Sequence, residues 1–211
     1  MASTQRMYGG VSAERRRAER RQRLLDAALD IIGEHGMAGL SVRGVCARAG
    51  LTSRFFYENF RDTDALAAEL FDEQMEHVLA RAATAVTDID TAGDLPAKIR
   101  AAGGHFLDEL TRDPRIARLV WTEALSHPAL AERRLAAIRL IAATGAQWAR
   151  ELLDLPPGPD PRLEATFLLL IGGYAEIALA WQNGAVDLTR DELLDLCRDY
   201  TLARVDLVTP H

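Results

Sequence analysis

The chain has 211 residues, of which 48% are hydrophobic and 27% charged, a balance typical of a soluble globular protein. No uncharged apolar run reaches the roughly 18 residues of a membrane span, and the arginine-rich start lacks the apolar segment of a secretory signal. The chain has two cysteines, so neither a disulfide framework nor a zinc site is expected. Cys46 and Cys197 are interpreted as packing residues of a cytoplasmic protein.

The net charge of −6 is distributed unevenly along the chain. Residues 1–61 contain 11 arginines and 6 acidic residues, whereas residues 62–211 contain 14 basic and 25 acidic residues. A basic head joined to an acidic body would hold the head against phosphates and keep the body away from them. We therefore expect two domains, a head of residues 10–62 and a body of residues 63–211.

Apolar residues recur at helical spacing almost throughout, and no segment has the alternation of a strand, which predicts an all-α fold. The first helix is expected from about Glu14 to His35, with Gly36 at its C-terminal end. Short helices follow over Ser41–Arg48, capped by Ser41, and over Ser53–Asn59, capped by Thr52. Asp62 caps a fourth helix that runs to about Val86.

Helix starts in the body share one pattern, in which an acidic or hydroxyl residue precedes a proline that needs no N–H in the first turn. The residues are Asp113–Pro114, Ser126 before Pro128, and Asp160–Pro161. Thr189 and Glu192 form a capping box that opens the last helix. The segment Leu155–Pro159 contains three prolines and a glycine, so it must be a loop. About nine helices and no sheet are predicted.

The segment Leu40–Phe60 has the pattern of a helix-turn-helix. Two short helices meet across Ala49-Gly50-Leu51, where the glycine permits a sharp reversal. Phe56 and Phe60 are expected to hold the second helix against the first long helix. The polar face of this second helix then carries short donors and an arginine that are able to reach base edges or phosphates.

These residues resemble the TetR family of bacterial transcription regulators, in the series Gly36, Ser41, Ala49-Gly50-Leu51-Thr52, Phe56-Tyr57, Phe60 and Leu66. The resemblance is close over roughly residues 20–68, whereas the body matches in length and helical character alone. It implies that Tyr57, Glu58 and Asn59 contact backbone phosphates and that the start of the recognition helix faces the major groove. The DNA-binding candidates are Ser41, Arg43, Thr52, Ser53, Arg54, Phe55, Tyr57, Asn59 and Thr63.

Two positions differ from what DNA contact would require. The family usually has a phosphate-binding lysine at the start of the fourth helix, where this chain has Thr63 between Asp62 and Asp64. The N–H groups at that helix start are still able to meet a phosphate. Glu58 would repel a phosphate unless a neighbouring arginine pairs with it.

The N-terminal arginines extend the expected DNA contact. Such a stretch is able to lie along phosphates or to enter the minor groove, where narrow A·T tracts attract arginine. A solvated helix start would explain the same residues without any DNA. The arginines are Arg15, Arg16, Arg17, Arg20, Arg21 and Arg23, of which the first four are DNA-binding candidates.

The resemblance implies that the body binds an effector and dimerises. Candidate ligand residues are His105, Phe106, Trp121, Trp148, Phe167 and Tyr174, each of which is alternatively a core residue. The last two long helices, about Pro161–Asn183 and Thr189–Leu207, are the expected dimer surface, as opposed to stripes buried within the monomer. Its candidate residues are Gly173, Ile177, Trp181, Leu193, Leu196 and Tyr200.

The predicted function is that of a homodimeric repressor, released from a palindromic operator by a small hydrophobic effector. An alternative keeps DNA binding but makes the body a protein-interaction platform without a small-molecule pocket. A third possibility is a helical enzyme or carrier whose head is a structural cap. No catalytic order of Ser, His and Asp, no metal-ligand spacing and no phosphate-binding glycine loop is found, so neither catalysis nor a cofactor or metal is expected.

Overall fold

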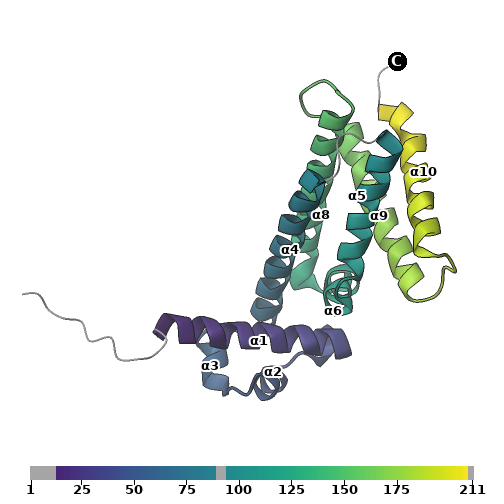
Figure 1. The fold of residues 1–211 in the computed structure, drawn as a ribbon. Coiled ribbons are helices and arrows are strands. Elements are labelled where there is room, and N and C mark those ends of the chain that lie inside the picture. Colours follow the sequence, from purple (N-terminus) through teal and green to yellow (C-terminus); the bar gives the residue numbers. More distant parts are fainter. Residues whose placement is uncertain (1–12, 89–93, 209–211) are drawn as a thin grey trace, which may run out of the picture.

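The computed structural model describes residues 13–88 and 94–208, all of whose regular elements are helices (Figure 1). The long helices of the body stand side by side, and α1 runs across one end of them (Figure 1). The elements are α1 (Ala13–His35), a 3-10 turn η1 (Met37–Gly39), α2 (Val42–Ala49), α3 (Ser53–Tyr57), α4 (Thr63–Asp88), α5 (Leu95–Thr111), α6 (Pro114–Ala117), a π-helical turn η2 (Arg118–Glu123), α7 (Ala124–Ser126), α8 (Pro128–Leu152), α9 (Pro161–Gln182) and α10 (Arg190–Val208). If the contiguous residues 114–126 are taken as one interrupted helix, the described residues form the nine helices that were predicted.

The head is held together by the apolar face of α1. Leu25 and Ile32 of α1 are both 0% exposed, and Phe56 of α3 is also 0% exposed. Burying an aromatic side chain of this size stabilises the fold by roughly 2–3 kcal/mol relative to an exposed position. This burial anchors α3, which with five residues is too short to be stable alone.

Most of the predicted helix starts are confirmed. Asp113 and Asp160 accept N–H groups of the first turns of α6 and α9, and Asp62 Oδ1 accepts the Ala65 N–H at 2.7 Å. The capping box that opens α10 is present, because the Thr189 amide donates to Glu192 Oε2 at 2.8 Å. The prediction of a side-chain cap at Thr52 is wrong, since its hydroxyl makes no such bond.

Helix α9 is unusual because it is very apolar yet little buried. By length and composition it is the one described helix able to cross a membrane, with a mean hydropathy of 1.6 over an 18-residue window. Only 28% of that window is buried within the chain. The core helix of a helical body meets the same criteria, and α9 packs against α5, α8 and α10. Its remaining apolar face is available to a further partner.

Candidate nucleic-acid interface

The turn between α2 and α3 has the geometry that the sequence predicted. Ser41 Oγ accepts the Gly44 amide at 3.1 Å and so caps α2. Gly50 ends α2 at φ 63°, in the left-handed region that glycine adopts without strain. The Leu51 amide then donates to the Cys46 carbonyl at 2.9 Å. These bonds fix the direction in which α3 leaves α2.

The side chains of α3 divide between the core and the solvent. Phe56 points into the core, whereas the side chain of Tyr57 is 61% exposed and that of Arg54 is 84% exposed. Thr52 and Ser53 are exposed at the start of the helix. Figure 1 shows α2 and α3 on the side of α1 that faces away from the body. A duplex is therefore able to approach α3 without meeting the acidic body.

Glu58 is paired, as its position beside DNA would require. Its Oε1 atom lies 3.0 Å from Arg54 Nε, and its main-chain carbonyl accepts a hydrogen bond from Arg17 Nη2 at 3.1 Å. Asn59 turns its amide inward, where Nδ2 donates to the Phe55 carbonyl at 2.8 Å. Asn59 thus stabilises the end of α3 and is less available to a phosphate than we expected.

The N-terminal arginines lie on α1, where they form two groups. One group is exposed or lies beside the recognition helix, and the other makes contacts within the head. Arg15, Arg16 and Arg17 are exposed. The guanidinium of Arg20 lies 4.6 Å from the centre of the Phe55 ring, next to the recognition helix. Arg21 and Arg23 instead hold the head together, because Arg21 pairs with Glu69 of α4 and Arg23 donates to the Ala49 carbonyl.

The remaining candidates lie around this surface. Arg43 of α2 is exposed, whereas the Ser41 hydroxyl is occupied by its capping bond. Thr63 opens α4 at a half-buried position, and Asp62 accepts one of the N–H groups there. The N-terminal end of α4 therefore presents fewer free N–H donors to a phosphate than an uncapped helix would.

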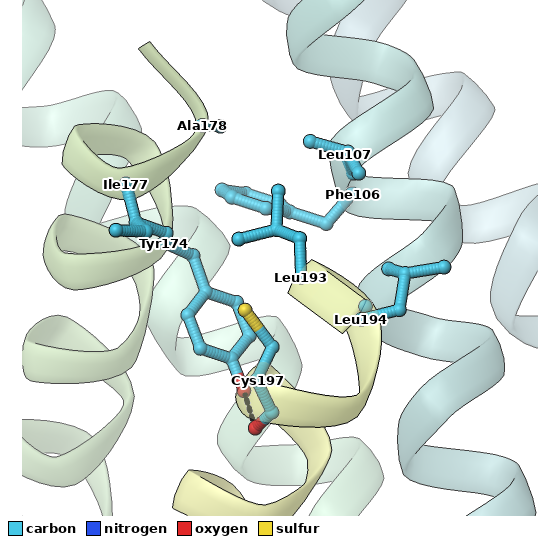
Figure 2. Close-up of a pocket in the computed structure, with 9 residues that line it drawn as sticks. Phe106, Leu107, Tyr174, Ile177, Ala178, Leu193, Leu194 and Cys197 are labelled. Carbon is cyan, nitrogen blue, oxygen red and sulfur yellow. Dashed lines mark hydrogen bonds between the residues drawn. The ribbon is translucent and has the colours of Figure 1, made fainter. Parts of the chain in front are cut away.

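Four of the six ligand candidates line two small cavities in the described part of the body. Phe106 and Tyr174 border a cavity of about 10 Å³ between α5, α9 and α10 (Figure 2). Trp148 and Phe167 border one of about 50 Å³ between α5, α8, α9 and α10. His105 is exposed on α5 and Trp121 is buried below Arg134, and neither borders these cavities.

Tyr174 is bound within the body by its hydroxyl group. The hydroxyl donates to the Cys197 carbonyl at 2.6 Å (Figure 2). It also contacts the Thr201 hydroxyl. Burial raises the pKa of this phenol to about 12. Burial likewise raises the pKa of the Cys46 and Cys197 thiols, which keeps both neutral and unreactive, as packing residues are.

The dimer candidates separate into exposed and buried residues. Gly173, Leu196 and Tyr200 are exposed on α9 and α10, and a Cβ atom at Gly173 would meet nothing within 4 Å. The expectation for Leu193 is wrong, because it is 1% exposed and faces the monomer core. Ile177 borders the smaller cavity, and Trp181 Nε1 donates to the Leu188 carbonyl at 2.7 Å.

Sequence reasoning missed Leu169, which at 72% is the most exposed large hydrophobic residue of the described chain. It lies one helical turn before Gly173 on α9, and this spacing could have identified it. Among the described residues, no group of three or more His, Cys, Asp or Glu side chains has an arrangement able to hold a metal ion.

An exposed second helix on a basic, three-helix head is the arrangement of a DNA-binding helix-turn-helix segment. Residues 24–70 match the family described as bacterial regulatory proteins, tetR family. This match covers the helix-turn-helix and the start of α4. Solved structures bear on the fold of the whole chain.

Three solved structures have the same fold over nearly the whole chain. A candidate transcriptional regulator from Pseudomonas aeruginosa PAO1 is 20% identical, with a TM-score of 0.73, and the match covers 92% of this chain and 91% of that one. The fatty acid degradation regulator FadR from Bacillus halodurans is 17% identical, with a TM-score of 0.71 and coverages of 88% and 96%. A TetR-like transcriptional regulator from Rhodococcus sp. RHA1 is 20% identical, with a TM-score of 0.66 and coverages of 91% and 98%.

Proposed function

We propose that this protein is a homodimeric repressor that binds a palindromic operator and leaves it when a small hydrophobic effector binds the body. The observation that carries the DNA-binding part is the exposure of Arg54 and Tyr57 on α3, beside the arginines of α1. If the head were only a structural cap of an enzyme or carrier, nothing would favour the gathering of exposed arginines and Tyr57 around α3. The head spans residues 10–62 and the body residues 63–211, of which residues 10–12, 89–93 and 209–211 lie outside the described part. We expect the protein to act in the cytoplasm.

Each DNA-binding candidate has a role in this proposal. Thr52, Ser53, Arg54 and Phe55 enter the major groove, because they occupy the first turn of the recognition helix. Tyr57 and Arg43 lie along the phosphates, as do Arg15, Arg16, Arg17 and Arg20 of α1. Ser41, Asn59 and Thr63 lie at helix ends beside them, where the first two already make hydrogen bonds within the head. Phosphate contacts of this kind fix the register of the head on the duplex, whereas the first turn of α3 reads the bases.

The apolar face of α9 and α10 supports dimerisation. Leu169, Leu196 and Tyr200 expose 72%, 50% and 47% of their surface in the single chain. A Cβ atom at Gly172 or Gly173 would meet nothing within 4 Å, so a second copy of the same two helices is able to come close to α9 there. A two-fold axis through this face would produce a four-helix interface. It would also set two heads about one DNA turn apart, roughly 34 Å.

The effector is proposed to enter the cavity lined by Trp148 and Phe167. Its walls are apolar apart from Thr166, Thr201 and Arg204, which favours a largely hydrophobic compound. The cavity of about 50 Å³ is far smaller than the several hundred Å³ that drug-sized ligands occupy. Effector binding must therefore move helices of the body apart, and the free energy for that movement comes from the difference in affinity for the two states.

The small cavities favour a second candidate function, a DNA-binding regulator whose body is a protein-interaction platform. A thermal-shift screen with hydrophobic compounds separates the two candidates. A ligand that binds the folded state raises the melting temperature as its concentration rises, and an effector must in addition release operator DNA. A stabilising compound that releases no DNA, or a screen without any stabilising compound, favours the platform.

Gel shifts with the DNA that flanks the gene test the DNA-binding proposal itself. We expect the wild-type protein to bind selectively and the Arg54→Ala, Tyr57→Ala double variant to lose that selectivity. Arg139→Ala is the matched control, because Arg139 is exposed on α8 of the body and far from α3 in the chain. An equal loss in the control, or selective binding by the double variant, would contradict the proposal.

A further inference from the structure

The end of α1 is gripped by side chains from the interrupted helix of the body. Arg118 Nη1 donates to the Gly33 carbonyl at 3.2 Å, and the Met37 amide donates to Glu123 Oε2 at 2.9 Å. Arg118 Nε also donates to Glu123 Oε1 at 3.1 Å, so the two body residues hold each other in place. We call these two residues, with the groups of Gly33 and Met37 that they bind, the head clamp.

Two glycines allow the body to approach this closely. Gly33 lies in the last turn of α1, and Gly36 follows its C-terminal end. A Cβ atom at Gly33 would lie 2.4 Å from Arg115 Cγ, and one at Gly36 would lie 2.6 Å from Glu123 Oε1. Gly36 also has φ 71°, a conformation that other residues rarely adopt. Arg115 pairs in turn with Asp30 of α1 and with Asp113, the residue that caps α6. A side chain at Gly33 would therefore displace Arg115, and one at Gly36 would displace the carboxylate of Glu123.

The π-helical turn explains why Arg118 and Glu123 meet. In an α-helix, residues five apart point about 140° away from each other. In a π-helix, the i to i+5 hydrogen bond brings residues five apart close to one another, one turn apart. Residues 118–123 form such a turn, and its other face is anchored in the body by Trp121, which is 9% exposed and lies under the guanidinium of Arg134 from α8. The clamp is thus built on a turn that is buried in the body.

We propose that Arg118 and Glu123 are positioning residues that set the orientation of the DNA-binding head relative to the body. Helix α4 runs on from the head into the body. If α4 were the only connection, the angle between head and body would change whenever α4 bends. The clamp attaches the C-terminal end of α1 to the body as well. With two points of attachment, the angle between head and body is fixed. Its consequence for DNA rests on the proposed function, because head orientation determines which half-site spacing a dimer accepts.

Two substitutions at Glu123 test the clamp against a matched control. Glu123→Ala removes both the ion pair and the acceptor for the Met37 amide, whereas Glu123→Gln keeps one acceptor oxygen. Glu109→Ala is the control, because the Arg81–Glu109 pair links α4 to α5 without touching α1. The pairs are alike in exposure, with 14% for the Glu109 side chain and 15% for that of Glu123. Thermal melting confirms that each variant is folded.

The first measurement needs no DNA. A dye is attached to Ala47→Cys, an exposed position of α2, in a Cys197→Ser background of the full chain, and its time-resolved fluorescence anisotropy is recorded. We expect Glu123→Ala to add a nanosecond decay from independent motion of the head, which Glu123→Gln shows in smaller amplitude and Glu109→Ala does not show. A folded Glu123→Ala variant with the wild-type decay, or the same new decay in Glu109→Ala, would overturn the proposal.

The second measurement concerns operators whose half-site separation is changed by one base pair. In Glu123→Ala the preference for the best separation should fall by about two- to thirtyfold, while Glu109→Ala keeps the wild-type preference. An unchanged preference in Glu123→Ala would contradict the positioning role. A wild-type protein that binds no operator would instead contradict the proposed function, and the anisotropy result would still decide whether the clamp holds the head.

Discussion

Arg54 Nε and Glu58 Oε1 lie 3.0 Å apart, at the start and just past the end of the recognition helix. The pair holds the arginine along the helix and at the same time cancels part of its charge. Because both side chains are largely exposed, their mutual attraction is weak and a phosphate is able to compete for the arginine. If Arg54 contacts DNA as proposed, Glu58 lowers the affinity of that contact.

Replacing Glu58 with glutamine should strengthen DNA binding. The substitution removes one negative charge from the interface and frees Arg54, so we expect an affinity gain of up to about fivefold at moderate salt. Anisotropy titration of a labelled duplex measures it. Glu132→Gln, at an exposed position of α8, controls for the change in net charge. Weaker binding by Glu58→Gln would show that the carboxylate itself contributes to recognition.

The Phe56→Ala substitution should unfold the head. Phe56 is 0% exposed and its ring packs against those of Tyr57 and Phe60, with centres 5.4 and 5.8 Å away. Removing a ring of this kind costs about 3–5 kcal/mol of folding free energy. Denaturant unfolding followed by circular dichroism checks this value, and a loss below about 1 kcal/mol would mean that α3 is held mainly by other contacts.

The helix-turn-helix was the part of the chain most open to prediction. Ser41 caps α2, Gly50 ends it and Phe56 is buried, as residue type and spacing in this short segment indicated. The arginines of α1 were harder, because their number says nothing of which carboxylates or carbonyls lie nearby. Arg21 and Arg23 proved to bind Glu69 and the Ala49 carbonyl, partners 48 and 26 positions away in the chain.

A charge at Leu169 should abolish dimerisation. Leu169→Glu places a carboxylate in the centre of the proposed interface, where it would lose its water without gaining a partner. Sedimentation velocity should show a folded monomer. Leu125→Glu on α7 is the control, because Leu125 is 55% exposed but lies outside α9 and α10. Dimers in Leu169→Glu, or monomers in both variants, would place the interface elsewhere.

The buried phenol of Tyr174 should make stability fall at high pH. Its pKa is about 12 in the folded chain and near 10 when exposed, so the unfolded state loses its proton first. The contribution of this group is present below pH 10 and is lost as the pH rises from 10 towards 12. Unfolding free energies should therefore drop more steeply over this window in wild type than in Tyr174→Phe. Parallel curves would contradict the shift.

The body was predicted well in outline and poorly in detail. Helix starts followed from Asp–Pro pairs and from the capping box, which are local signals. The burial of an apolar side chain on α10 is not local, because Leu193 and Leu196 lie less than one turn apart on the same helix and yet are 1% and 50% exposed. The π-helical turn that lets Arg118 meet Glu123 also leaves no simple periodic pattern.

The most direct test of the account is the salt dependence of operator binding by the full-length protein. If the basic head holds phosphates, affinity falls steeply as salt rises, and Arg16→Ala lowers the slope of log K against log salt by about one. Selectivity for the operator over unrelated DNA should persist across the series. A folded protein that binds all sequences alike at every salt concentration would contradict the claim that α3 reads DNA.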